Sequence, residues 1–469
     1  MKKSKISIVF IAFALIFSQG ILFAQPAPPT LICTVSGTNL ALSWTDCLDA
    51  EGYFLCYAPY PEGGSISRID MGSQTEFAVD LWEGAAFYVA IQAYDRSGHS
   101  GYSNIEYFQT TPLPDFSTSA ASLDSDLTGI LQTTFDSATV PGAALSITFN
   151  DGSTWMKTVG AASLTDTGAI PLDGDMRFRI GSVTKTMVAT AILMLVDQGK
   201  LALDDTVETI LPGVITGGDG ITLEGLLSHG SRLINYTMLD VFRDRYLDTP
   251  EYPWTRDEII DLFANEPLVP ASAVEESYYS NSNYYLLGMI IEKISGTSLA
   301  QFMEDFIFIP LGMMDTYVPT SNSISGYYAD GYVDMNYDGL FEPGEKISSQ
   351  SPVAAWSAGS VISTLSDLSI WAKELMSGSL ISETLQEKRM TFKWHVAGAP
   401  EAVNYGLGVM NQFEQIGHTG AVAGYTTIMF SYKGNIIIAY TNGYYLRNSD
   451  PNVPDLLLQS VVERIDSRL

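Results

Sequence analysis

The fold of this chain is decided by Ile180-Gly181-Ser182-Val183-Thr184-Lys185 and the apolar run from Met187 to Val196 that follows it. The run has the length of a buried helix, so Ser182 and Lys185, three residues apart, are expected on one face at its N-terminus. The helix dipole favours an oxyanion there, and burial of the lysine would make it a base. The pattern has two interpretations: a nucleophile with its base, or a capped helix that carries a surface lysine.

Two later segments carry residues of matching chemistry. Tyr278-Tyr279-Ser280-Asn281 precedes an apolar helical pattern, and Gly417-His418-Thr419-Gly420-Ala421 precedes a strand pattern at Tyr425. A phenol beside a lysine can relay a proton, and a carboxamide can orient a substrate carbonyl. Each segment also has a structural interpretation, because Tyr-Ser-Asn is a common helix cap and His-Thr-Gly a common turn.

In this order, the three segments resemble the motifs of the serine enzymes that recognise penicillin: class C β-lactamases, D-alanyl-D-alanine carboxypeptidases, and related esterases and peptidases. The resemblance covers nearly all of residues 122–469. Further segments typical of that family lie at 221–229, 310–313, 358–368 and 405–408. The resemblance implies an α/β domain in which an antiparallel sheet is flanked by helices and joined to an all-helical region.

The resemblance also implies a role for each matched residue. Ser182 becomes acylated, Lys185 accepts its proton, and Tyr279 relays the proton to the leaving group. The implied substrate-binding positions are Asn281, His418, Thr419 and Gly420, and the backbone N–H groups of Ser182 and Ala421 form the implied oxyanion hole. No metal or organic cofactor is implied for catalysis.

Two departures from the family pattern bear on these roles. His229-Gly230-Ser231-Arg232-Leu233 replaces the usual His-Thr-Ser-Gly-Leu, which indicates a different backbone and a structural role for His229. Carboxypeptidases of this type often place an arginine before the third motif, but residues 393–433 contain none, and Met410-Asn411-Gln412 stands in its place. A free substrate carboxylate would then depend on the third motif itself.

Hydrophobic periodicity predicts a multidomain chain. Residues 29–109 predict a small β-sandwich with strands at 40–44, 53–57 and 87–93, and the spacing resembles a fibronectin type III module. Such a module acts as a spacer or contacts the cell envelope. Residues 110–121 have the composition of a linker. The domain at 122–469 is expected to contain helices at 123–135 and 456–465 and hairpins at 143–149/154–160 and 425–432/436–441.

The N-terminus indicates the compartment. Residues 1–24 have the basic, apolar and small-residue order of a secretory signal peptide, with an uncleaved anchor as the alternative. No later stretch predicts a transmembrane segment. We therefore expect an exported protein that is periplasmic, cell-surface or extracellular. Its cysteines, Cys33, Cys47 and Cys56, allow one disulfide and leave one thiol over.

The net charge of the chain limits which classes of molecule it is expected to bind. The chain has 24 Lys and Arg against 53 Asp and Glu, a net charge of −29, which argues against nucleic acid. The expected ligand is a small-molecule or peptidoglycan-peptide substrate with an amide, ester or β-lactam bond, including D-alanyl peptides. The alternatives are a small-substrate esterase or amidase, and a catalytically silent surface-binding protein.

A calcium-loop pattern lies outside these motifs. Residues 334–345 place oxygen-bearing groups at the spacing of such a loop, with Gly339 at its sharp turn. The six predicted ligand positions are Asp334, Asn336, Asp338, Leu340, Glu342 and Glu345. The alternative is an acidic surface turn, because Pro343 blocks the helix that would follow in an EF-hand.

If the loop holds a structural calcium ion, removing the ion should lower the melting temperature, because the ion stabilises only the folded chain. The measurement is thermal unfolding with excess chelator and again after calcium is restored. An unchanged melting temperature would leave the acidic surface turn as the interpretation.

Overall fold

The computed structural model describes residues 26–59, 66–81, 85–95, 98–110, 117–271, 277–392, 394–395, 403–444, 446 and 452–466. The predicted signal peptide lies outside these residues. The chain divides into two compact units, Met1–Pro114 and Asp115–Leu469. Helix α1 (Ser117–Asp136) opens the second unit, so its first residues fall in the segment that composition assigns to a linker.

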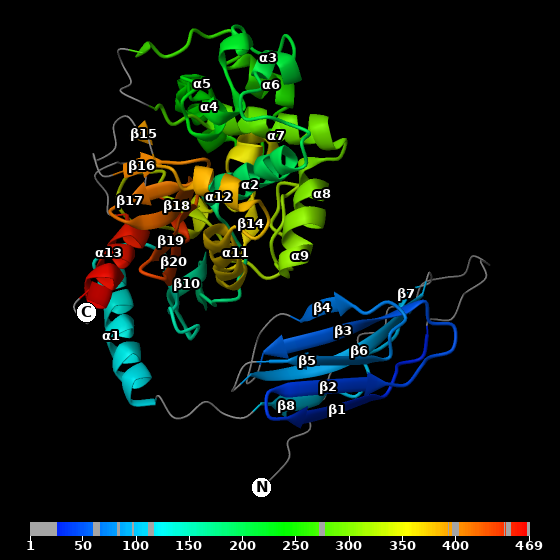
Figure 1. The fold of residues 1–469 in the computed structure, drawn as a ribbon. Coiled ribbons are helices and arrows are strands. Elements are labelled where there is room, and N and C mark those ends of the chain that lie inside the picture. Colours follow the sequence, from blue (N-terminus) through cyan, green and yellow to red (C-terminus); the bar gives the residue numbers. More distant parts are fainter. Residues whose placement is uncertain are drawn as a thin grey trace, which may run out of the picture. The chain divides into compact units, whose positions relative to one another are not determined.

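The first unit consists of two antiparallel sheets (Figure 1). One sheet contains β1 (Leu31–Ser36), β2 (Asn39–Trp44) and β5 (Glu76–Asp80); the other contains β3 (Gly52–Pro59), β4 (Ser67–Asp70), β6 (Ala86–Asp95), β7 (Gly98–His99) and β8 (Glu106–Gln109). Leu42 and Trp44 of one sheet share a buried cluster with Leu55 and Ile91 of the other. The arrangement is a β-sandwich; the fibronectin type III assignment stays a prediction. Its three cysteines are free thiols.

A nine-stranded antiparallel sheet organises the described part of the second unit. Its order is β11 (Gly168–Pro171), β10 (Thr154–Thr165), β9 (Gly142–Thr148), β20 (Asn435–Thr441), β19 (Tyr425–Tyr432), β18 (Gln415–Val422), β17 (Met410–Gln412), β16 (Val403–Tyr405) and β15 (Trp394–His395). Both predicted hairpins are present, and β9 pairs with β20, which joins distant parts of the chain at the centre of the sheet.

One face of this sheet packs against α1 and α13 (Val453–Asp466), which lie side by side (Figure 1). Successive side chains on a strand point to opposite faces of the sheet, so every second side chain packs against these two helices. Phe430 and Ile437 belong to the cluster that contains Leu457 of α13, whereas their neighbours Met429 and Ile438 belong to the larger cluster on the other side. Both terminal helices were predicted, and the predicted α/β domain with helices on an antiparallel sheet is confirmed.

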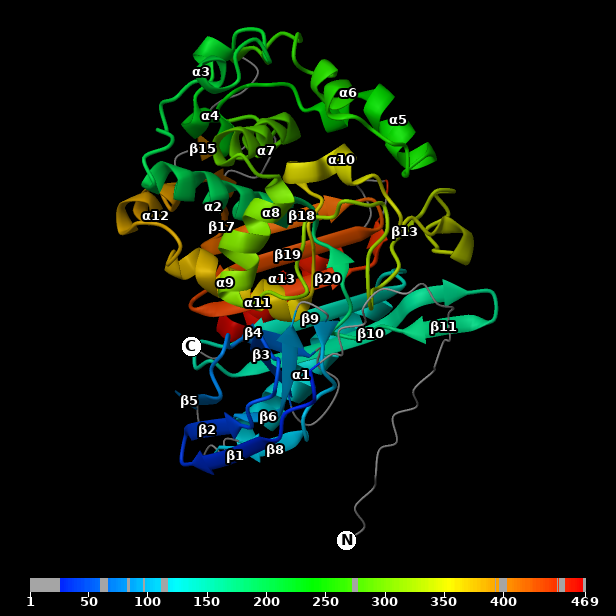
Figure 2. The same cartoon turned by 90° about the vertical axis from the view of Figure 1, so that its right-hand side faces the viewer.

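The other face packs against α2 (Thr184–Asp197), α11 (Leu365–Ser377) and the helical region that includes α7 (Asn281–Ser295) (Figure 2). Helix α2 is buried along almost its whole length, as its apolar sequence predicts. It lies between the sheet and the helical region, so the residues at its N-terminus meet groups from both. None of the helices in the described ranges is long and apolar enough to cross a membrane.

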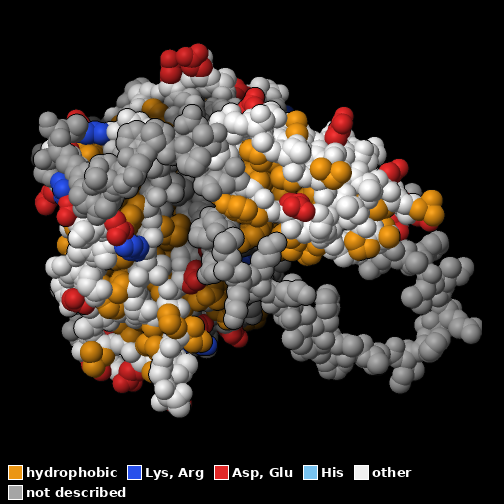
Figure 3. All heavy atoms as spheres, turned by 90° about the horizontal axis from the view of Figure 1, so that it is seen from below, with side chains coloured by type: hydrophobic (Ala, Val, Ile, Leu, Met, Phe, Trp, Pro, Cys, Tyr) orange, Lys and Arg blue, Asp and Glu red, His pale blue; other side chains and the backbone are white. Residues whose placement is uncertain are grey.

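The surface carries the acidic excess of the sequence. On the face drawn in Figure 3, acidic side chains are spread widely and basic ones are few, in line with 53 acidic against 24 basic residues. The charge therefore lies on the outside of packed domains.

Leu457 tests the packing of α13. It is fully buried, whereas its neighbour Leu456 is 43% exposed. Leu457→Ala should lower the free energy of unfolding by about 2–5 kcal/mol because it leaves a cavity between helix and sheet. The matched variant Leu456→Ala should change it by less than about 1 kcal/mol. Denaturant unfolding measures both, and equal effects would contradict the packing described here.

Candidate active site

Two glycines bring strand β18 against the turn that carries Ser182. A Cβ atom on Gly181 would lie 2.5 Å from the backbone nitrogen of Ala421, and one on Gly420 would lie 2.0 Å from the carbonyl oxygen of Ile180. Neither distance leaves room for a side chain, and Gly181 also has a φ of +54°. The backbone nitrogens of Ser182 and Ala421 are therefore brought into neighbouring positions, the proximity that the predicted oxyanion hole needs.

The side chain of Lys185 lies fully buried one turn into the helix. Its Nζ is 2.8 Å from Ser182 Oγ, 2.7 Å from Asn281 Oδ1 and 2.6 Å from the carbonyl oxygen of Ala358. Burial lowers the pKa of Lys185 well below its ordinary value of 10.5, because the ammonium form loses its hydration. The lysine is therefore suited to act as a base.

The partners of Lys185 fix the direction of proton transfer. The Ala358 carbonyl can only accept a hydrogen bond, and Asn281 presents its own carbonyl oxygen to the lysine. A neutral amine has two N–H donors, which these two oxygens use, and one lone pair, which then faces the hydroxyl of Ser182. This arrangement matches a base that removes the serine proton.

Asn281 is held in place by residues that the sequence motifs did not include. It is the first residue of α7, and its Nδ2 donates to Asn235 Oδ1 at 3.2 Å and to Thr237 Oγ1 at 2.8 Å. These two bonds orient the carboxamide oxygen toward Lys185. The amide was predicted to orient substrate; in the structure it lines the cavity and also positions the base. Asn235 and Thr237 belong to no motif, so only the fold reveals their part.

Tyr279 lies between Ser182 and a buried histidine. Its hydroxyl interacts with Ser182, and its ring centroid is 4.3 Å from that of His229. Burial raises the pKa of Tyr279 above its usual value of 10, while the nearby hydroxyl of Ser182 acts in the opposite direction. The phenol therefore keeps its proton at neutral pH and can donate it to a leaving group.

His229 supports this tyrosine and contributes no free base. Its Nδ1 accepts from the backbone N–H of Ser280 at 3.2 Å and lies 3.0 Å from Asn283 Nδ2. Its backbone has a φ of 62°, as does that of Arg232, so the departure from the family sequence coincides with an unusual backbone path. The side chain is fully buried, and burial keeps its pKa well below 6.5.

His418 is a neutral, buried residue that points to a tyrosine. Its Nδ1 contacts the carbonyl oxygen of Thr419, which can only accept, so Nδ1 carries the proton. Its Nε2 then accepts from the hydroxyl of Tyr405 at 2.8 Å. Burial lowers the pKa of His418 to about 3. His418 therefore offers no cation to a substrate carboxylate at neutral pH.

The neighbourhood of the third motif also lacks a positive charge in the described residues. Strand β17, formed by Met410-Asn411-Gln412, pairs with β18 as far as Gly417. Thr419 follows on the same strand, partly exposed, with its Oγ1 3.9 Å from the sulfur of Met410. The structure therefore brings Thr419 and Gly420 close to Ser182 without supplying the arginine that is missing from the sequence.

A cavity of about 340 Å³ opens beside Ser182. Its catalytic end is lined by Ser182, Asn281, Ala358, Gly359 and Ala421. The rest of its wall comes from other segments: Tyr236, Thr237, Met238, Phe242, Arg243, Tyr246, Leu247, Ala355, Val422, Ala423, Tyr444 and Leu446. The serine is thus accessible to a small ligand from a mostly apolar cavity.

The predicted calcium loop folds around backbone hydrogen bonds. Asp334 accepts from the backbone N–H groups of Asp338 and Gly339, both at 3.1 Å, and Glu345 accepts from that of Met335 at 2.9 Å. Leu340 and Glu342 lie on the same turn. Among the described residues, no group of three or more His, Cys, Asp or Glu side chains is placed to hold a metal ion. Calcium binding stays a prediction.

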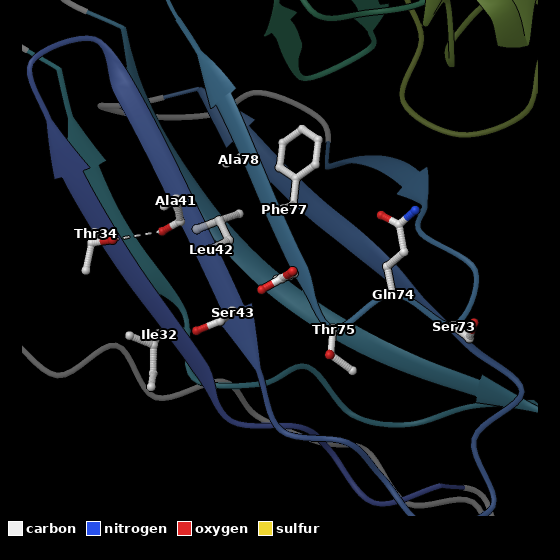
Figure 4. Close-up of a pocket in the computed structure, with 11 residues that line it drawn as sticks. Ile32, Thr34, Ala41, Leu42, Ser43, Ser73, Gln74, Thr75, Phe77 and Ala78 are labelled. Carbon is white, nitrogen blue, oxygen red and sulfur yellow. Dashed lines mark hydrogen bonds between the residues drawn. The ribbon is translucent and has the colours of Figure 1, made fainter.

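A larger hollow, of about 890 Å³, lies on the outer face of β1, β2 and β5 in the first unit (Figure 4). Its wall carries Thr34, Ser43, Gln74 and Glu76, with Phe77 on the edge strand. No lysine, histidine or tyrosine lines it, and the carboxylate of Glu76 is the ionisable side chain among its lining residues. This face lacks the groups for nucleophilic catalysis that the second unit brings together.

Comparison with known proteins gives a family and several relatives. The Beta-lactamase family model matches residues 127–460. Penicillin-binding protein 4* of Bacillus subtilis is 32% identical over 275 residues, which cover 56% of this chain and 59% of that protein. The match therefore spans less than two thirds of the relative's own length.

Two solved structures share the fold of the second unit. A D-stereospecific amidohydrolase from Streptomyces sp. is 28% identical with a TM-score of 0.61, and the match covers 68% of this chain and 94% of that one. The D-amino acid amidase from Ochrobactrum anthropi SV3, complexed with L-phenylalanine amide, is 25% identical with a TM-score of 0.62. That match covers 74% of this chain and all of the amidase chain.

The lowered pKa of Lys185 predicts the pH dependence of acylation. The neutral amine is the active form, so the acylation rate should rise with pH through the lowered pKa and level off well below pH 10.5. His418, with a pKa of about 3, should add no step near pH 6.5. Pre-steady-state acylation by a chromogenic substrate measures the profile. Replacing Lys185 by Met should lower the rate by about 10²–10⁴-fold, and a wild-type rate that keeps rising with pH up to 10.5 would contradict this assignment.

Proposed function

The chain belongs to the Beta-lactamase family, and we propose that it is an exported active-site serine hydrolase that forms an acyl-enzyme on Ser182. The proposal rests on one observation above all: the buried Nζ of Lys185 lies 2.8 Å from Ser182 Oγ with its other hydrogen-bonding directions already used. A surface lysine on a capped helix would have no such environment. The same geometry speaks against a catalytically silent protein.

Acylation follows from these contacts. Lys185 removes the proton of Ser182, and Oγ attacks the substrate carbonyl carbon. The carbonyl oxygen becomes an oxyanion beside the N–H groups of Ser182 and Ala421. The C–N or C–O bond of the substrate then breaks, and the leaving atom takes the proton of Tyr279, which Lys185 replaces. The products are acylated Ser182 and a neutral amine or alcohol; in a β-lactam the amine stays attached.

Hydrolysis of the acyl-enzyme reverses these roles. A water molecule transfers a proton to the Tyr279 and Lys185 pair as its oxygen attacks the acyl carbon. The same oxyanion hole stabilises the second tetrahedral intermediate. The bond between the acyl carbon and Ser182 Oγ breaks, and Oγ regains a proton from the pair. The acid product leaves, and the neutral lysine and the serine hydroxyl are restored.

The substrate class that this site supports best is an amide or ester without a free carboxylate beside the third motif. His418 is neutral, and Met410-Asn411-Gln412 supplies no charge. The structural relatives are a D-stereospecific amidohydrolase and a D-amino acid amidase. An amidase or esterase for small substrates is therefore favoured over a D-alanyl carboxypeptidase, whose substrate carries a free C-terminal carboxylate.

We further propose that the first unit presents this hydrolase at the cell envelope. The basic and apolar order of residues 1–24 supports export. The sandwich has its own buried core, so it can serve as a separate spacer or contact module.

Intact-mass spectrometry tests the acyl-enzyme. Incubation with a penicillin should add the mass of one penicillin to the wild-type protein, because the lactam amine stays attached after ring opening. Ser182→Ala should show no adduct. An adduct of the same mass on Ser182→Ala would overturn the proposal, as would a wild type that shows no adduct and also turns over neither the penicillin nor a D-amino acid amide.

Turnover of three substrates separates the substrate classes. A D-amino acid amide and a short-chain ester should be hydrolysed with a higher kcat/KM than a D-alanyl-D-alanine peptide, because only the peptide has a terminal carboxylate. Ser182→Ala gives the background rate for each. The opposite order would assign the site to a carboxypeptidase and leave the acyl-enzyme mechanism intact.

A further inference from the structure

The cavity beside Ser182 has a second part with a different chemistry from its catalytic end. We call this part the outer lobe and define it by four residues: Tyr246 and Leu247 of α5 (Asp240–Asp248), Tyr444 of β21 (Gly443–Tyr444) and Leu446. The hairpin turn after β18 joins the two parts, because Ala421 lies at the oxyanion hole and Ala423 packs with the outer lobe.

The outer lobe is the open side of a small apolar cluster. Val333, Ile347 and Ala423 form the buried centre of this cluster, and the four residues of the outer lobe pack on it while only partly buried. All four also line the cavity. An apolar group that entered the cavity would therefore complete this cluster and exclude water from it.

The charge at the rim disfavours an anionic group. Arg243 is the cation among the described residues that line the cavity, and its Nη2 is 2.9 Å from Asp240 Oδ1 and 3.1 Å from Asp244 Oδ1. These three residues together carry one net negative charge. The rim thus has no uncompensated positive charge for a carboxylate, just as His418 has none on the other side of the serine.

The lobe lies on the acyl side of the scissile bond. Tyr279 is the group placed to protonate the leaving atom, so the leaving group must lie toward Tyr279. Neither Tyr279, His418 nor Thr419 lines the cavity that contains the outer lobe. The part of the substrate that extends into that cavity is therefore the part that stays on Ser182.

We infer that the outer lobe is an acyl-group subsite that selects bulky, uncharged apolar groups, aliphatic or aromatic, with Leu247 and Leu446 as specificity-determining residues. This inference rests on the proposed acylation of Ser182. The catalytic residues alone do not discriminate between acyl groups, whereas the outer lobe does.

Three p-nitrophenyl esters test the subsite: acetate, 3-phenylpropanoate and the monoester of succinic acid. The wild type should hydrolyse the phenylpropanoate with a kcat/KM about tenfold or more above that of the acetate, because the phenyl group is buried in the outer lobe. The succinate, which has an anionic end, should show no such gain. Equal values for acetate and phenylpropanoate would overturn the inference.

Single substitutions test whether the outer lobe causes the preference for the phenylpropanoate ester. Leu247→Ala should lower the phenylpropanoate-to-acetate ratio several-fold, a change that a loss of folding would not produce because it lowers both values alike. The matched variant Val241→Ala lies on the same helix, 53% exposed and outside the cavity wall, and should keep the ratio. The double variant Asp240→Asn/Asp244→Asn frees the charge of Arg243 and should raise the succinate value. A ratio that Leu247→Ala leaves unchanged would overturn the inference.

Hydrolysis of p-nitrophenyl acetate distinguishes a failure of the proposed function from a failure of the subsite inference alone. If acetate is hydrolysed at the same rate by the wild type and Ser182→Ala, the proposed function fails and the subsite fails with it. If acetate hydrolysis depends on Ser182 but the phenylpropanoate gains nothing, the subsite inference fails alone.

Discussion

The burial of one amine governs the chemistry of this protein. Lys185 can serve as a base only where water does not stabilise its ammonium form, so the fold has to enclose its Nζ completely. It does so with groups from three segments: Ser182 in the turn just before α2, Asn281 at the start of α7 and the carbonyl of Ala358. The helical region and the sheet therefore both have to close over the N-terminus of α2 before the site exists.

The second constraint is the contact between α2 and the edge of β18. An oxyanion hole built from two backbone N–H groups needs two chain segments closer together than side chains permit, and the glycines at 181 and 420 allow that approach. The nine-stranded sheet serves this contact, because β18 is held by β19 along its whole length and by β17 only up to Gly417. Beyond Gly417 its edge is available to the turn that carries Ser182.

Local spacing was enough to predict the main hairpins and both terminal helices, and the family resemblance implied the α/β fold and the grouping of Ser182, Lys185, Tyr279 and Asn281. The neighbouring residues that hold these side chains in position could not be predicted. Asn235 and Thr237 hold the amide of Asn281 through contacts across 44 or more positions, and nothing in their own sequence marks them. Ala358 lies in a family segment, but its carbonyl contact with Lys185 depends on the fold. Tyr405 also lies in a family segment, but its bond to His418 depends on the register of three strands, β16, β17 and β18.

Because His418 is neutral, it does not offset the negative charge of the chain, and this affects which substrates can bind. At the level of sequence, a histidine in the third motif could have supplied a positive charge within a protein of net charge −29. In the folded site its two nitrogens are used by Thr419 and Tyr405, and Arg243 is paired with two aspartates. The cavity thus offers an anion no cation to offset the negative surface around it. A substrate that approaches Ser182 is favoured if it is neutral or positively charged, and apolar contact rather than ion pairing has to hold it there.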